Sequence, residues 1–296
     1  MSKKDVWVGR CDLCFSRRSP GDCLTLHKSS FNAPFKLMKA ISHKEGRCEI
    51  PILHTAGGLI GGDELILNVK SEKKSSALMT TVAAQKVYGT VGRSKIHPEG
   101  AYAKQVCNFS IEEGGDLEWI PQELVMFEGA LFEQCTRVQL ALEASFLSAE
   151  VVRLGRTASG ETLGNGAWRS KVEIIRKTRH SSNWEFIDQL ELSGNSLSSE
   201  HGLSSNPVFG SLIWIAPSQF KGKQIDQLVN DCRSLRKNLS GTMSCTALNK
   251  GISARYLGES TQQARFWFLR IWSAIRKGRG LSTPKDIRFW PLQENN

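Results

Sequence analysis

The stretch HTAGGLIGGDELIL (residues 54–67) places four glycines within six positions and follows them with two carboxylates. Glycine inside a regular element costs roughly 0.5–1 kcal/mol relative to alanine, so such a concentration indicates tight turns or close approach of backbone segments. A phosphate-binding loop, a metal site and closely packed architecture would each use glycines in this way. The rest of the sequence has to distinguish between them.

The spacing does not fit the familiar phosphate-binding loops. The pattern G-x-x-x-x-G-K-[ST] needs a lysine and a hydroxyl after its last glycine, whereas Asp63 and Glu64 follow Gly62. Two carboxylates at this place would repel a phosphate. The order Gly-Gly-x-x-Gly-Gly also differs from G-x-G-x-x-G, so the stretch contains no recognisable nucleotide site.

Carboxylates that flank glycine-rich or apolar segments are candidate ligands for a metal ion. Asp63 and Glu64 follow the glycines, and Glu118 and Glu123 lie in the segment LEWIPQELVMF. Pro121 cannot donate to a sheet ladder, so it marks an edge or a bulge that could turn these carboxylates inward. The alternative is an aspartate that caps a turn, with the glutamates simply solvated.

Histidines and cysteines give little indication of catalysis. The six histidines are dispersed and form no H-E-x-x-H pattern, and GRTASGE (residues 155–161) lacks the first glycine position of a G-x-S-x-G elbow. Cys11 and Cys14 form the one C-x-x-C, but on a strand their side chains would lie on opposite faces, which favours packing. We expect no enzymatic activity, although a general base assembled in space stays possible.

The elements that must position these residues are mostly strands. Several segments are rich in β-branched and aromatic residues, and no helical periodicity separates them, which favours an all-β body over an α/β sheet. The run at 124–127 is apolar on both faces and predicts stacked layers. The predicted strands cover residues 65–69, 77–82, 101–111, 137–154, 168–177, 184–192 and 208–216.

Two helices are predicted near the C-terminus. One carries apolar residues at helical spacing between Ile225 and Leu235, and the other runs over 260–277 behind a capping box at 260–263. The apolar stripe of the second helix includes Trp267, Phe268 and Trp272. Such a stripe either packs in the core, as helical spacing favours, or anchors a partner protein.

The chain has 296 residues, of which 40% are hydrophobic, enough for a substantial core in one or two domains. No apolar run is long enough for a transmembrane helix, and the N-terminus does not resemble a signal peptide, so we expect a cytoplasmic protein with reduced cysteines. The net charge is +10, and residues 219–296 carry +9 of it. This basic part suggests an acidic partner surface, nucleic acid, or a solvated face.

Five of these segments, in this order, resemble the urease accessory protein D family, which is called H in some species. The glycine stretch resembles the family signature His-x-x-Gly-Gly-x-x-Gly-Gly-Asp. The segments TTVAAQKVYG, GGDLEWIPQELVMFEGA, GRTASGE and ISARYLGESTQQARFWFLRIWSAIR resemble its other motifs, and together they span nearly the whole chain.

This resemblance implies a mainly β fold of superhelical, β-helix-like layers with a few helices, in a single domain over 1–296. A β-rich body would cover about 1–216 and a basic, helix-containing part about 217–296. The resemblance also implies a non-catalytic chaperone that assembles with accessory proteins F and G on apo-urease, so that nickel is incorporated into the urease active site. GTP hydrolysis would belong to G, and neither a membrane nor nucleic acid is an expected partner.

A delivery protein needs weak, exchangeable contacts with its cargo, and scattered carboxylates along a partly wet passage would provide them. At the motif positions we therefore expect a transient nickel(II) path, with no permanently bound cofactor, along Asp63, Glu64, Glu118 and Glu123, with His54 as a further donor. The principal alternative is a basic nucleic-acid-binding β protein. A hydrolase on a β scaffold is a more distant one.

Overall fold

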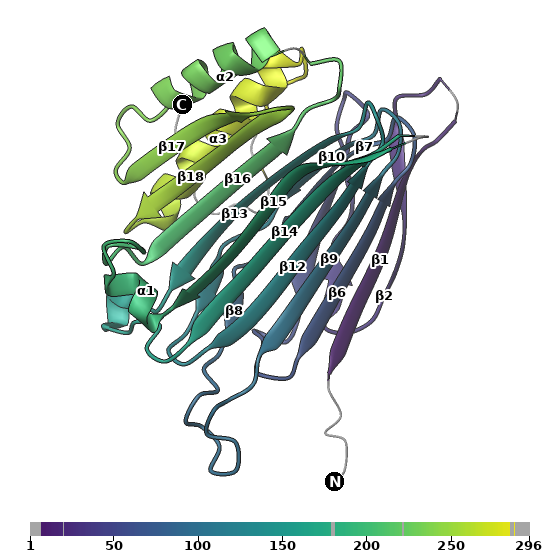
Figure 1. Cartoon of the computed structure of the whole chain (residues 1–296). Helices are drawn as coiled ribbons and strands as arrows, with labels where there is room; N and C mark the ends of the chain where they lie inside the picture. The colour runs from purple at the N-terminus through teal and green to yellow at the C-terminus, as the bar shows by residue number, and fades with distance from the viewer. Residues whose placement is uncertain (1–6, 20, 179–180, 221, 285–286, 288–296) are drawn as a thin grey trace.

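The computed structural model describes residues 7–19, 21–178, 181–220, 222–284 and 287, and within them the strands form two stacked sheets (Figure 1). One sheet has seven strands in the order β15-β14-β12-β9-β6-β1-β2. Its strands are β1 (Val8–Arg17), β2 (Thr25–Phe31), β6 (Glu64–Ser71), β9 (Ala103–Ile111), β12 (Leu131–Leu140), β14 (Ala167–Lys177) and β15 (Ser182–Ser193).

The other sheet has eleven strands, and its main path runs β17-β18-β16-β13-β10-β7-β5-β3. The short strands β4, β8 and β11 pair beside this path. The members are β3 (Phe35–Leu37), β4 (Ile41–Ser42), β5 (Cys48–His54), β7 (Ser76–Thr81), β8 (Gln85–Val87), β10 (Asp116–Ile120), β11 (Leu124–Met126), β13 (Ser145–Leu154), β16 (Val208–Ile215), β17 (Thr242–Leu248) and β18 (Gly251–Gly258).

The chain winds between the two sheets like a β-helix. From β5 to β14 the main strands alternate between the sheets, so strands that neighbour each other within one sheet are parallel, as in β6–β9–β12–β14 and β5–β7–β10–β13. Parallel pairing usually needs a crossover helix, but here the opposite sheet supplies the return path. The prediction of a mainly β fold with β-helix-like layers is confirmed.

Two hydrophobic cores result. The first lies between the sheets and receives the inward-facing residues of both, such as Phe109 from the seven-stranded sheet and Phe146 from the other, whose ring centroids are 5.3 Å apart. The second lies between the outer face of the eleven-stranded sheet and helices α2 (Gly222–Ser234) and α3 (Thr261–Gly278). Figure 1 shows both helices on that face, and β17 and β18 continue the same sheet beneath them.

Helix α3 begins where the sequence predicts. Ser260 is its N-cap, and its side chain accepts a hydrogen bond from the Gln263 backbone N at 3.3 Å. The capping box is only half formed, because the Gln263 side chain accepts from Ser240 N at 3.1 Å instead of turning back to the cap. A short helix α1 (Gly194–Ser198) and a 3-10 turn, η1 (Thr157–Ser159), were not predicted.

The outer edge of β17 is covered by arginines from the helix layer. Arg233 Nε donates to the Cys245 carbonyl oxygen at 3.0 Å, and Arg236 Nη1 donates to the Met243 carbonyl oxygen at 2.9 Å. These bonds satisfy backbone acceptors that an edge strand otherwise leaves open.

The four glycines of residues 57–62 have conformational and steric causes. Gly57 and Gly62 have φ values of 76° and 99°, in the left-handed region that favours glycine. A Cβ on Gly58 would lie 2.5 Å from the Tyr88 ring, and one on Gly61 would lie 2.3 Å from a backbone carbonyl oxygen. Tight turns and close packing therefore account for these four glycines.

Candidate functional site

Two adjoining cavities, of about 60 and 40 Å³, lie inside the sandwich. A cavity needs only about 10–15 Å³ to hold one water molecule, so each has room for several. Unlike the surrounding core, their walls carry polar side chains. The residues that line both cavities are Gln105, Trp119, Pro121, Gln134 and Glu150.

Glu150 is the acidic residue at the centre of this polar wall. Gln134 Nε2 donates to its two carboxylate oxygens at 2.6 and 2.7 Å, and to Ser170 Oγ at 3.3 Å. Burial raises the pKa of Glu150 to about 7, although the bond from Gln134 and the charge of Arg255 act in the opposite direction. At neutral pH this carboxyl group is therefore divided between its protonated and ionised forms.

The strand register creates the polar wall. Gln105 on β9 pairs with Gln134 on β12, which pairs with Ser170 on β14, so three inward polar residues form a row across the seven-stranded sheet. Opposite them, Glu150 on β13 pairs with Ser211 on β16. Sequence reasoning did not select these residues. The signal was present, since each lies at an inward position of an alternating strand whose neighbours at i±2 are largely apolar.

Of the predicted path residues, His54 is the one that lines the interior space. It lies at the end of β5, and its Nε2 atom is buried with no hydrogen-bond partner among the described residues. Burial lowers the pKa of His54, and the nearby charge of Asp63 only partly opposes this effect. A neutral imidazole with a free nitrogen is a metal-binding group.

Asp63 and Glu64 lie at the turn that leads into β6. The Asp63 carboxylate accepts a hydrogen bond from the Ile60 backbone N at 2.9 Å, and its own N donates to the Ile60 carbonyl oxygen at 3.0 Å. Asp63 thus caps the glycine turn, as the structural alternative from the sequence proposed. Glu64 is half-buried on the face of β6 that points away from the inter-sheet core.

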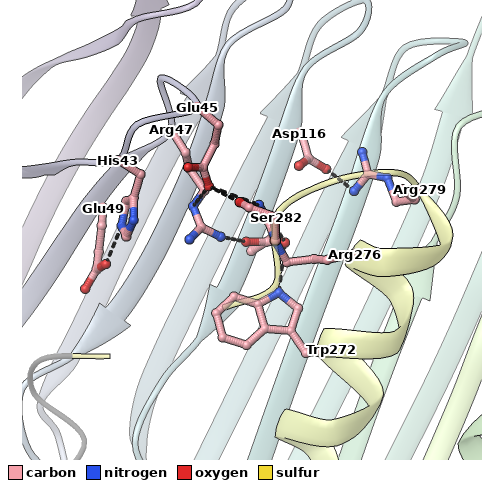
Figure 2. A network of polar contacts seen from close by, with 10 residues as sticks. His43, Glu45, Arg47, Glu49, Asp116, Trp272, Arg276, Arg279 and Ser282 are labelled. Atoms are coloured by element: carbon pink, nitrogen blue, oxygen red, sulfur yellow. Dashed lines mark hydrogen bonds and ion pairs between the residues drawn. The ribbon is translucent and has the colours of Figure 1, made fainter. Parts of the chain in front are cut away.

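Glu118 faces the helix layer instead of the cavities and binds Arg47, Trp272 and Arg276, whose side chains are labelled in Figure 2. One carboxylate oxygen accepts from Arg47 Nη1 at 2.7 Å, and the other accepts from Arg276 Nη1 and Trp272 Nε1, both at 2.8 Å. The side chains of Arg47, Glu118 and Arg276 are each only 2% exposed. Glu45 lies 3.3 Å from Arg276 and accepts from the Ser282 hydroxyl at 2.7 Å.

Pro121 lies at a break in the eleven-stranded sheet, as expected. It separates β10 from β11, and in the neighbouring chain segment residues 82–84 separate β7 from β8. Ala83 is exposed and lines the larger cavity, which places the mouth of that cavity at this break. Glu123, however, points towards α3 and forms an ion pair with Arg265. The proline therefore does not turn Glu118 or Glu123 into the interior.

The aromatic stripe of α3 packs in the second core. Trp267, Phe268 and Trp272 are at most 3% exposed, and Trp267 Nε1 donates to the Cys232 carbonyl oxygen at 3.2 Å. Direct contact of these side chains with a partner would require an exposure that they lack in the isolated chain. In this structure the three aromatic side chains are therefore core residues.

The arginines of the basic C-terminal part bind within the protein. Arg255 pairs with Asp188 at 2.6 Å, Arg279 with Asp116 at 2.8 Å, and Arg270 Nη1 donates to the carbonyl oxygens of Leu235 and Lys237. Other arginines make similar contacts, namely Arg233 and Arg236 at β17, Arg265 at Glu123 and Arg276 at Glu118. These contacts attach the helices to the sheet. Part of the basic character of this region therefore serves internal contacts, several of them with acidic partners.

The described residues hold neither a clustered metal site nor a membrane-spanning helix. They contain no group of three or more histidine, cysteine or acidic residues that could hold a metal ion. None of their helices has the length and apolar character needed to cross a lipid bilayer. All eight cysteines are free thiols, and Cys11 and Cys14 lie on opposite faces of β1, as predicted.

Known proteins resemble this chain over nearly its full length. The sequence profile described as UreD urease accessory protein matches residues 8–291. The urease accessory protein UreD of Synechococcus sp. (strain WH7805) is 52% identical over 299 residues, covering 99% of this chain and 94% of that protein. The UreD of Prochlorococcus marinus (strain MIT 9303) is also 52% identical, with 97% and 98% covered. The chain therefore belongs to the UreD family of urease accessory proteins.

Proposed function

We propose that this protein supports urease maturation by passing nickel(II) through the space between its two sheets, in a complex with accessory proteins F and G on apo-urease. The names of the relatives support a role beside urease. The nickel path and the identity of the partners are parts of the proposal. In it the protein acts in the cytoplasm as a non-catalytic chaperone, and GTP hydrolysis belongs to G.

The observation that carries the proposal is the polar wall inside an otherwise apolar core. Buried polar groups cost free energy unless they are hydrogen-bonded, so a core built for stability alone would place apolar residues at these positions. Instead Gln105, Gln134 and Glu150 face a cavity large enough for water. Such a site can take a hydrated cation that a dry core would exclude.

The donors suit transit more than storage. Nickel(II) binds imidazole nitrogen, and carboxylate and amide oxygen atoms complete a shell only weakly. His54 offers one uncharged nitrogen near the mouth of the larger cavity, and Glu150 offers one carboxylate farther inside. Because the proton on Glu150 competes with the metal ion near neutral pH, binding there is reversible.

The five residues predicted from the motifs enter this proposal unequally. His54 lines the path, and Asp63 holds the turn beside it and contributes charge. Glu64, Glu118 and Glu123 lie outside the cavities, and the last two are bound to arginines. For Glu118 and Glu123 to take part, their ion pairs with arginines would have to open. A role for any of the three carboxylates in the path stays a prediction.

The test compares urease activation by interior and surface variants. In cells that produce urease with all its accessory proteins, Glu150→Gln and His54→Leu should lower the nickel content of purified urease, while F and G still co-purify with the chain. The matched control is Glu173→Gln, which changes a carboxylate on the outer face of the same sandwich. Full nickel loading with both interior variants would exclude the path.

A second experiment addresses the motif residues. If Asp63→Ala and Glu123→Ala chains fold, retain F and G and still yield fully loaded urease, these two carboxylates are not needed for transfer. A tagged wild-type chain that recovers neither urease nor two further accessory proteins would contradict the proposed assembly.

A further inference from the structure

The loop that connects β8 to β9 is hydrogen-bonded within itself and exposes an isoleucine, Ile96, to solvent. Gly92 N donates to the Pro98 carbonyl oxygen at 2.8 Å, and the backbone N atoms of Ile96 and His97 lie 3.3 and 3.2 Å from Ser94 Oγ. Ile96 is nevertheless 82% exposed, the largest exposure of any large hydrophobic side chain in the described residues. An apolar side chain on a pre-shaped loop can bind a partner with little loss of conformational entropy.

The glycine turn fixes the base of this loop. Gly61 leaves no room for a Cβ, because that atom would lie 2.3 Å from the Ala101 carbonyl oxygen and 2.9 Å from Thr90 Cγ2. Thr90 Oγ1 in turn donates to the Ala101 carbonyl oxygen at 3.1 Å. Residues 57–62 and 89–101 therefore form one rigid end of the sandwich, and Ile60 within it is 54% exposed.

Exposed cations lie within and next to the loop that carries Ile96. Lys86 precedes the loop, Arg93 and Lys95 lie within it, and Lys104 follows it. All four side chains are exposed, and none forms an ion pair within the part of the chain that the structure describes. Exposed lysines without an ion pair also occur elsewhere among the described residues, such as Lys73, so what distinguishes this end is that such cations accompany the most exposed isoleucine.

Two acidic residues lie nearby and offset part of this positive charge, while Arg93 and Lys95 keep no ion pair among the described residues. Glu99 lies 3.4 Å from His97, and Glu64 is half-buried at the start of β6. In Figure 1 this end lies at the bottom, where β1 begins and where the chain after β8 projects beyond the sheets. This end of the sandwich therefore carries two exposed apolar residues, Ile60 and Ile96, on segments joined through Gly61, Thr90 and Ala101, and exposed cations on or next to those segments.

We propose that residues 57–62 and 89–101 are a docking surface for a protein partner that presents an apolar pocket rimmed by carboxylates. Ile96 enters the pocket, and Arg93 and Lys95 meet the acidic rim. Aromatic and aliphatic anchors supply most of the affinity of an interface, and complementary charges accelerate association. That the partner is a member of the urease assembly rests on the proposed function, whereas the chemistry of the surface does not.

The test uses the full chain with each purified accessory protein and apo-urease of the source organism as probes. Ile96→Asp should weaken binding of one of them at least tenfold. The double change Arg93→Glu with Lys95→Glu should weaken the same complex and reduce its dependence on salt. Calorimetric titration at two salt concentrations measures both effects.

Matched controls come from outside residues 57–62 and 89–101, one halfway along the edge strand β15 and one in the turn between β6 and β7. Ile187→Asp changes an isoleucine with the same 54% exposure as Ile60, and Lys73→Glu reverses an exposed lysine. Both controls should bind within twofold of the wild type. Unchanged unfolding temperatures would show that the loop variants remain folded, as expected for exposed positions.

Several results would overturn the proposal. One is that the Ile96→Asp variant and the charge-reversal variant bind every probe as tightly as the wild type does. Others are a wild-type dimer that Ile96→Asp dissociates, or affinity for duplex DNA or anionic vesicles that the charge reversal removes, because each assigns the surface to another ligand. Failure of the nickel path can be distinguished from failure of the docking surface, because Glu150→Gln should leave the assembly intact, whereas the loop variants should prevent it.

Discussion

Replacing Glu118 by glutamine tests whether this carboxylate is an anchor of the helix layer. The change removes the charge between Arg47 and Arg276 and leaves two guanidinium groups, each 2% exposed, with the more exposed Glu45 as their remaining carboxylate. Removing one partner of a buried pair typically costs about 3–5 kcal/mol. We expect a loss of this size in the free energy of unfolding, a large part of the roughly 5–15 kcal/mol typical of a folded protein.

Thermal unfolding gives the most direct measurement. One kcal/mol shifts the midpoint by about 2–4 °C in domains of about 150–250 residues, so the expected decrease is about 6–20 °C. Glu191→Gln is the matched control, because its bond to Arg169 at 3.1 Å is exposed and should matter little.

A triple variant separates the cost of an unpaired charge from the cost of lost packing. Arg47→Met, Glu118→Leu and Arg276→Met together remove every charge of the central triad, and this chain should be more stable than Glu118→Gln. An unfolding midpoint of Glu118→Gln equal to that of the wild type would refute the reasoning. If nickel loading of urease then fell as well, the carboxylate would act on the cargo and not as an anchor.

Three further outcomes follow from burial and close packing. Because the pKa of Glu150 is raised from 4.5 to about 7 in the folded chain, this group should make stability fall as pH rises through that interval, and Glu150→Gln should flatten the urea-unfolding profile there. Burial raises the pKa of the Cys11 thiol to about 12, so iodoacetamide should label the exposed Cys23 long before Cys11, as peptide mass spectrometry can determine. Gly61→Ala places a Cβ against a backbone carbonyl oxygen and should cost about 1–3 kcal/mol in chemical denaturation, whereas Gly222→Ala, in open space, should change stability by less than about 1 kcal/mol.

Several regular elements could be predicted because their signals are local, but the single strand predicted over 137–154 was wrong, since these residues belong to β12 and β13 in opposite sheets. Alternating apolar residues place β14 and β15 within about two residues of their predicted limits, and the cap at Ser260 sets the start of α3. The winding could not be predicted from periodicity, because a parallel neighbour such as β6 for β1 lies some 50 residues away in the chain. It came from the family resemblance instead.

The candidate site shows where local reasoning ends. Glu118 and Glu150 both lie in alternating strands, and the sequence does not say which face of each strand meets the cavity. The partner of Glu118 could have been suspected, since Arg276 falls four residues after Trp272 on the apolar stripe, where an arginine needs a buried acceptor. Glu150 could be recognised only once Gln134 was known to face it across the sandwich.

The arginines along β17 bear on how this chain avoids other copies of itself. A protein built mainly from strands has sheet edges whose backbone groups can pair with a strand of another copy, and growth of that kind ends in insoluble fibres. Arg233 and Arg236 close one such edge by occupying its carbonyl oxygens. Part of the basic character of the C-terminal region therefore serves solubility, because a foreign strand would have to displace two guanidinium groups before it could pair.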